Sequence, residues 1–241
     1  MRAAITGLLA FAAAEEQVLL FASLPPDPPD PPEPPDLPDL PDPPGPAAEG
    51  PDNWAAVPLV AHSTHFKQQQ SERTWALVHG HQIPSFGEID HRSESVYASY
   101  AACSRAEVLA QSRQVTADLI DAVWALPDDA LRGARVNGRM LWLQLIVRGF
   151  WHATGHLGDY YLGRGQAARA VALASHGVAT ARYLSAPGPA VGMACYNLAC
   201  ALARDGRHDQ AASALTEAVT LNPDLAANAS RDPDLAGVAS G

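Results

Sequence analysis

The chain has 241 residues and a mass of 25.4 kDa, which suits one large domain or one domain with a small appendage. Apolar residues make up 47% of it, so a buried core can form and wholesale disorder is excluded. The formal net charge of −10 argues against nucleic acid as a partner, because phosphate binding needs clustered Lys and Arg.

The cysteines and the hydropathy pattern bear on the compartment. Cys103, Cys195 and Cys200 are an odd number at irregular spacing, which is no disulfide framework and predicts a reducing, cytoplasmic location. No uninterrupted apolar run reaches ~18 residues, so we expect no conventional membrane span. The alanine-rich composition with a single lysine suggests a GC-rich bacterial coding sequence.

Two interpretations of the N-terminal segment compete. Arg2 is followed by an apolar stretch that ends in small residues at Ala12–Ala14, as in a secretory signal peptide. The apolar pattern nevertheless continues past Glu15 and Glu16 to Leu24, with helical spacing, where a cleaved peptide would have stopped. We therefore expect the first helix of a soluble bundle here.

Residues 25–46 read PPDPPDPPEPPDLPDLPDPPGP. Each proline lacks an N–H and fixes φ, so neither helix nor strand survives, and an extended polyproline-like segment is predicted. A ligand for a proline-recognising domain is one interpretation, but the tract has six acidic residues and no basic anchor. We favour a low-complexity loop between two helices and expect poor order over residues 25–50.

Apolar residues at helical spacing predict four long helices before residue 163. An Asp52–Asn53 cap is expected for the second, and Ser104 for the third. No stretch shows sustained strand alternation, so the predicted class is all-α, with the four helices forming a bundle. The predicted helices cover residues 2–24, 54–77, 104–126 and 139–162.

A repeat signal follows at residues 195–223, CYNLACALARDGRHDQAASALTEAVTLNP. Small and apolar residues stand at the offsets that a helical hairpin needs, Gly206 permits the turn, and Pro223 ends the second helix. The segment resembles the tetratricopeptide repeat family. The matching positions are Leu198, Ala199, Leu202, Gly206, Ala211, Leu215, Ala218 and Pro223.

A looser copy of the same offsets lies 41 residues earlier, from Leu157 to Gly177. Because the usual period is shorter, its second helix is expected to be longer and to end near Tyr183. The helix that contains Trp151 would then continue as the first helix of the repeat array, so the two parts should be fused rigidly. The chain end after Pro223 is expected to add a short capping helical turn.

The histidine spacing is the main chemical signal. His152 and His156 are four residues apart on a predicted helix, so both imidazoles can face one metal ion. The third ligand has to come from another helix, with His62 the best candidate and His65 the reserve. Zinc or nickel would accept three imidazoles and leave a position for water. No glutamate stands beside either helical histidine, so the HExxH protease motif is absent.

The segments LVAHSTHFKQQQ, FGEIDHRSESVYASY and GFWHATGHLGDYYLGRG, in this order, resemble the DinB-like four-helix-bundle superfamily and its ClbS/DfsB-type branch. The resemblance covers residues 1–163 apart from the proline tract. It implies one metal-binding histidine on the second helix and two on the fourth, here His62, His152 and His156. It also implies metal-dependent thiol S-transferases, thiol-dependent isomerases or hydrolase-like resistance proteins, and a homodimer.

These expectations combine into a domain of residues 1–163 and a tetratricopeptide-like extension of residues 164–241. The predicted function is that of a metal-dependent hydrolase or low-molecular-weight-thiol S-transferase, with Asp159 or Asp90 as acid, base or ligand-orienting group. One alternative is a non-catalytic module that binds a protein through the repeat. Another is a scaffold in which the histidines hydrogen-bond without metal.

Overall fold

The computed structural model describes residues 1–21, 54–86, 100 and 103–238, whose regular secondary structure is helical apart from one short hairpin. The predicted proline loop lies outside the described residues. The long single helices are α1 (Arg2–Phe21), α2 (Ala56–Val78), α4 (Arg105–Ala125), α8 (Ala167–Tyr183), α9 (Gly188–Arg204) and α10 (His208–Leu221). One further long helix is continuous and consists of α6 (Leu141–Ile146), the π-helical turn η3 (Val147–Trp151) and α7 (His152–Gly163). The short elements are α5 (Asp128–Gly133), β1 (Arg135–Val136), β2 (Arg139–Met140), η4 (Pro223–Leu225), α11 (Ala226–Ala229) and η5 (Pro233–Leu235).

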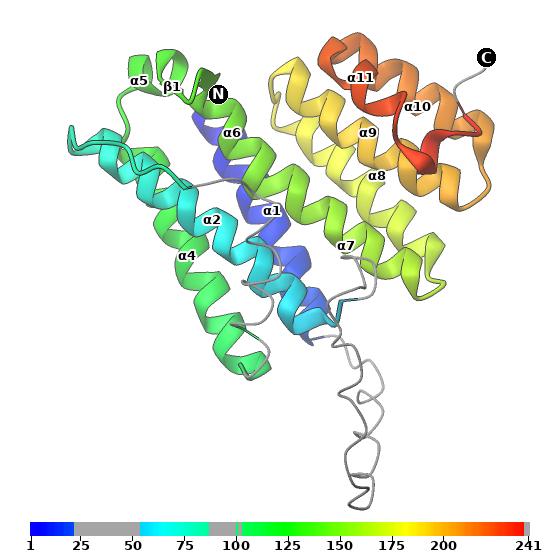
Figure 1. Ribbon diagram of the computed structural model, residues 1–241, viewed down its shortest axis with the longest axis horizontal. Helices are drawn as coiled ribbons and strands as arrows, with labels where there is room; N and C mark the ends of the chain where they lie inside the picture. The colour runs from blue at the N-terminus through cyan, green and yellow to red at the C-terminus, as the bar shows by residue number, and fades with distance from the viewer. Residues whose placement is uncertain (22–53, 87–99, 101–102, 239–241) are drawn as a thin grey trace, which may run out of the picture.

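The continuous helix α6–η3–α7 is central to the arrangement. Helices α2 and α4 lie on one side of it and α8–α10 on the other, as Figure 1 shows. Helix α1 packs against α4, η3, α7 and α8, so it contacts both halves. One hydrophobic core therefore runs from Ile5 to Val238. This continuity agrees with the expectation that the repeat segment is fused rigidly to the helices before it.

Helix α1 buries its apolar face in this core, including Ile5, Leu8, Leu9 and Leu19. By length and composition alone, α1 could also cross a membrane, and half of the relevant stretch is buried inside the protein. Glu15 and Glu16 interrupt this stretch, so the expectation that no uninterrupted apolar run reaches ~18 residues still holds. In this structure α1 packs as a core helix of the bundle.

The predicted start of α4 is confirmed and that of α2 is corrected. The Ser104 hydroxyl accepts from the Glu107 backbone N–H at 3.3 Å, and the Glu107 carboxylate accepts from the Ser104 N–H at 2.8 Å, which completes a capping box. These hydrogen bonds lower the pKa of Glu107. Helix α2 instead begins at Ala56, after an Ala55 that provides no side-chain cap, with Pro58 in its first turn.

The fourth long helix begins later than predicted, at Leu141 and not at Arg139. Residues 135–140 form the antiparallel β1–β2 hairpin instead. Its turn is Asn137–Gly138, with φ of 51° and 76°, the pair of positive angles that a type I′ turn requires. The Asn-Gly pair is a strong local hairpin signal, and here it prevents the helix from starting earlier.

The repeat segment follows the predicted pattern. Helix α8 ends at Tyr183, where the second helix of the looser repeat copy was expected to end. Gly206, with a φ of 77°, forms the turn between α9 and α10. Gly192 faces the Ala218 carbonyl of α10 so closely that a side chain would not fit. Of the short helical turns after α10, η4 packs on α10 and η5 packs on α9, which agrees with the expected cap at the end of the array.

Candidate metal centre

Three histidines meet between α2 and α7. The ring nitrogens of His62, His152 and His156 lie within 4.8 Å of one another. The Nε2 atoms of His62 and His152 are 3.1 Å apart, and the ring centres of His152 and His156 are separated by 4.3 Å. The structure therefore brings together the three side chains that the spacing and the resemblance named. The reserve candidate His65 contacts Gln69 at 2.8 Å and stays outside this group.

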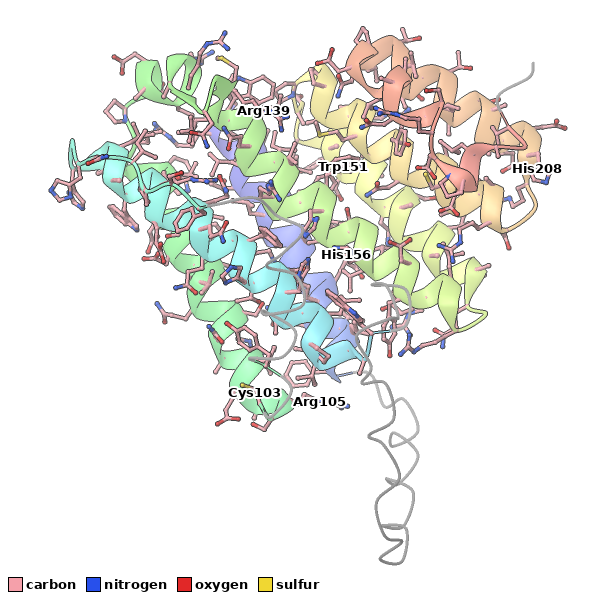
Figure 2. All side chains as sticks on the ribbon, in the orientation of Figure 1. Cys103, Arg105, Arg139, Trp151, His156 and His208 are labelled. Carbon is pink, nitrogen blue, oxygen red and sulfur yellow. The ribbon has the colours of Figure 1, made fainter. Side chains whose placement is uncertain are left out.

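The cluster depends on two different levels of structure. The four-residue spacing places His152 and His156 on one face of α7, where both point toward α2. His62 comes from a helix 90 residues earlier, and it reaches the cluster because α2 packs against η3 and α7. Figure 2 shows Trp151 and His156 along the same long helix, beside α2.

Aromatic rings surround the cluster. The Phe66 ring packs edge-on against His62 and His152, with ring centres 4.8 Å and 4.9 Å away. Trp54 packs against His62 at 4.9 Å and against His156 at 6.3 Å. These rings keep bulk water from one side of the histidines, so charge on the imidazoles is poorly solvated there.

Burial keeps the imidazoles of His62 and His152 neutral at neutral pH. It lowers the pKa of His62 to about 3, with further contributions from His156, His65 and Arg148. The pKa of His152 is also well below its usual value, first through burial and then through His156 and His62. Neutral imidazole is the form that binds a metal ion.

The same geometry also permits a metal-free arrangement. At 3.1 Å, one of the facing Nε2 atoms of His62 and His152 can donate a hydrogen bond to the other. The buried Nδ1 of His62 has no hydrogen-bond partner among the described residues. Metal-ligating histidines usually donate from their second nitrogen to a carbonyl or carboxylate, so this nitrogen is the weakest point of the candidate centre.

A cavity of about 330 Å³ opens beside the cluster. Asp159 is on its wall, three residues after His156, but its carboxylate is 3.2 Å from the Arg204 guanidinium on α9. A role as general base would have to compete with that ion pair. Asp90, the other acid candidate, is outside the described residues. The lining residues are Val147, Arg148, Trp151, His152, Gly155, His156, Asp159 and Asn197.

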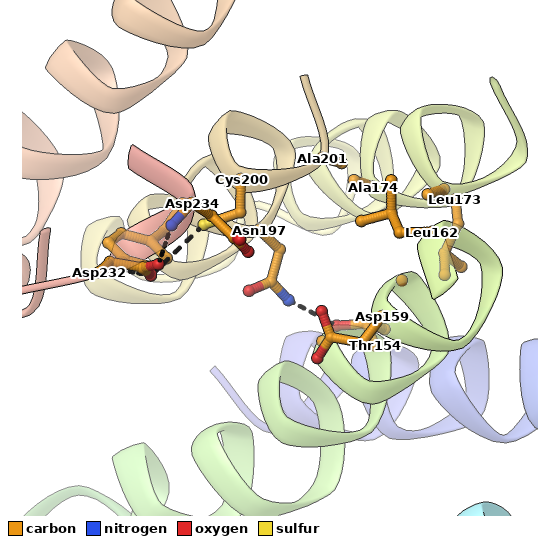
Figure 3. A pocket seen from close by; sticks show the side chains of 14 residues that line it. Thr154, Asp159, Leu162, Leu173, Ala174, Asn197, Cys200, Ala201, Asp232 and Asp234 are labelled. Atoms are coloured by element: carbon orange, nitrogen blue, oxygen red, sulfur yellow. Dashed lines mark hydrogen bonds between the residues drawn. The ribbon is translucent and has the colours of Figure 1, made fainter. Parts of the chain in front are cut away.

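A second cavity of about 180 Å³ lies between α7, α8, α9 and the C-terminal turns, as Figure 3 shows. Cys200, Asp232 and Asp234 also group there within 4.8 Å. Asp232 already accepts from the Tyr196 hydroxyl at 2.7 Å and from the Cys200 thiol at 3.7 Å, and Asp234 lies 3.7 Å from Arg204. Burial raises the pKa of Cys200, so the thiol stays protonated and is a poor ligand.

Sequence reasoning overlooked the charged residues nearest the histidines. Arg148 is four residues before His152, a spacing that could have placed it on the same helix face. Lys67 is the single lysine of the chain and pairs with Glu16 in the core. Both charges interrupt predicted apolar helices, which is the signal that could have identified them.

Comparison with known proteins supports one part of the chain. Residues 192–225 match the family model of the tetratricopeptide repeat. Comparisons with curated proteins and with solved structures found no match. The match covers helices α9 and α10 and does not extend to the histidine cluster. The comparisons therefore identify a tetratricopeptide repeat at residues 192–225.

Proposed function

We propose that the chain binds one zinc or nickel ion through His62, His152 and His156, on a bundle that resembles the DinB-like superfamily. The observation that carries this proposal is the meeting of three imidazoles from two helices within 4.8 Å. Their surroundings support it, because aromatic packing and burial favour the neutral rings that a metal requires.

The donor set fits such an ion. In a tetrahedral zinc site with bonds of ~2.0–2.1 Å, ligand atoms are about 3.3 Å apart. The observed 3.1 Å between the His62 and His152 nitrogens is close to this value. Three imidazoles without a thiolate suit zinc or nickel and leave a coordination position open.

The proposed reaction class is metal-dependent hydrolysis or transfer to a low-molecular-weight thiol. An ion held by three imidazoles supplies a bound water of lowered pKa or a site for a thiol sulfur. The aromatic rings of Phe66 and Trp54 exclude water on one side, and the cavity beside His156 accommodates a substrate. Asp159 on the cavity wall is the candidate to accept a proton.

Elemental analysis tests this proposal. Wild-type protein, reconstituted with zinc or nickel and then dialysed, should retain about one ion per chain. His62→Ala and His152→Ala should lose it, whereas His65→Ala is the matched control and should retain it. Absence of metal from the reconstituted wild-type protein would overturn the proposal. Retention in both the His62 and His152 variants would show that the ion binds elsewhere.

A second candidate function is protein binding through the repeat, and the family match at residues 192–225 favours it. Paired helices of this kind expose side chains along a shared face, and Tyr183 at the end of α8 is almost fully exposed. A partner that co-purifies in stoichiometric amount should be lost with Tyr183→Ser and retained with His152→Ala. The opposite pattern would assign the partner to the histidine side of the molecule.

A further inference from the structure

Arg148 occupies a specific position beside the histidine cluster. It is in the π-helical turn Val147–Trp151, four residues before His152, and it lines the same cavity. Its guanidinium carbon is 5.0 Å from the centre of the Phe66 ring, which also packs against His62 and His152. Arg148 and the histidines therefore share one aromatic wall. π-Helical turns recur at functional sites because they redirect side chains within a helix.

The charge on Arg148 is not balanced within the described part of the chain. No described carboxylate forms an ion pair with Arg148, and the acid on the cavity wall, Asp159, pairs with Arg204. Burial, followed by Arg73 and Arg139, lowers the pKa of Arg148. An arginine nonetheless stays protonated at neutral pH. The half-buried positive charge of Arg148 therefore persists near the positive charges of Arg73 and Arg139. Binding an anion would relieve this unfavourable charge.

An unsatisfied donor lies next to this wall. The Nε1–H of Trp151 is buried and has no hydrogen-bond partner among the described residues. Trp151 and Arg148 both line the cavity, on the side next to His152. A guanidinium provides a planar pair of N–H groups that match carboxylate or phosphate oxygens, and the neighbouring indole reports on what binds there.

We propose that Arg148, beside Trp151 on the cavity wall, forms an anion-binding subsite for the carboxylate or phosphate group of the substrate. This inference extends the proposed function, because it assigns to the reaction at the histidine centre a substrate that is a small organic acid or phosphate ester. The cavity of about 330 Å³ is of a size that holds a small molecule. The anion would lie along the helix from His152, so the rest of the substrate can reach the metal ligands.

The test uses metal-free full-length protein in a low-chloride buffer. Inorganic phosphate and malonate are titrated separately while the indole N–H signals are followed by NMR, with the Trp151 signal assigned from Trp151→Phe. The Trp151 signal should shift and saturate with at least one of the two anions. Arg148→Gln should weaken that binding by about tenfold or more, and Arg148→Lys less. Arg132→Gln, at an exposed arginine on α5, is the matched control and should bind as wild type.

The outcomes separate this inference from the metal proposal. Saturation with phosphate alone or malonate alone assigns the subsite to that anion. An equal shift in wild-type protein and Arg148→Gln, or no saturable shift with either anion, overturns it. Because the titration needs no metal, an Arg148-dependent shift would stand even if elemental analysis found no ion. Metal binding without an Arg148-dependent shift would leave the proposed function intact and reject the anion subsite.

Discussion

Lys67 donates to both carboxylate oxygens of Glu16 at 2.7 Å, and both side chains are completely buried. The Ser112 hydroxyl also donates to Glu16, at 3.1 Å. The pair therefore joins α1, α2 and α4 by charged hydrogen bonds inside an apolar core. These hydrogen bonds form only when the three helices pack in one particular alignment. Helical periodicity alone does not predict that alignment.

Removing one member of this pair should be costly. Lys67→Met leaves the Glu16 carboxylate buried without its counter-charge, and we expect a loss of about 3–5 kcal/mol in the free energy of unfolding. The double variant Glu16→Leu/Lys67→Met should recover a large part of that loss. Urea unfolding measures both. The control is Arg182→Met, which breaks an exposed pair with Glu217 at 2.6 Å and should cost about 1 kcal/mol or less. Equal losses at the two sites would contradict this account.

The repeat hairpin depends on close backbone contact at Gly192. A Cβ there would lie 2.9 Å from the Ala218 carbonyl oxygen and from Asn222 Cβ, so α10 would have to move away. We expect Gly192→Ala to lower stability by about 1–3 kcal/mol. Gly158→Ala, on α7, adds a methyl group that meets no atom within 4 Å beyond its chain neighbours and its own helix backbone, and it should be neutral or slightly stabilising. Thermal unfolding of the two variants makes the comparison, and equal midpoints would reject the close-contact argument.

Stability of the metal-free chain should fall in mild acid. The folded pKa of His62 is about 3 and its usual value is 6.5, so between these values the unfolded chain binds a proton that the folded chain does not. Protonation therefore favours unfolding below pH 6.5, and lowering the pH from 7 to 5.5 should cost about 1 kcal/mol through His62 alone. Chemical denaturation at a series of pH values should show a shallower decline for His62→Gln than for wild type. Identical slopes would exclude His62 as a source of the decline.

Zinc should stabilise the folded chain if the three imidazoles bind it. A ligand present at 100 times its dissociation constant adds about 2.7 kcal/mol, which raises the unfolding temperature. The increase should disappear in His156→Ala and persist in His65→Ala. An equal increase in wild-type protein and His156→Ala would show that zinc acts at another place on the chain. Calorimetry with and without zinc measures the effect.

Local features of the sequence determined much of the helical structure. Ser104 is the predicted cap of α4 and Gly206 makes the predicted repeat turn, because each depends on neighbours within one helical turn. The spacing between the two repeat copies predicted that α8 ends near Tyr183. The fourth long helix begins at Leu141 and not at Arg139, because the Asn137–Gly138 turn, which apolar periodicity does not register, forms a hairpin there. His152 and His156 share a helix face for the same local reason.

Tertiary packing decided what surrounds those histidines. His62 joins them only because α2 packs against η3 and α7, and His65 on the same helix lies outside the group. Arg148 acquires its place in the cavity, and Glu16 its partner Lys67, from contacts between helices that are distant in sequence. Periodicity along one helix determines which face a side chain occupies. Which other helix covers that face depends on packing of the whole core, and no short segment of the sequence contains that information.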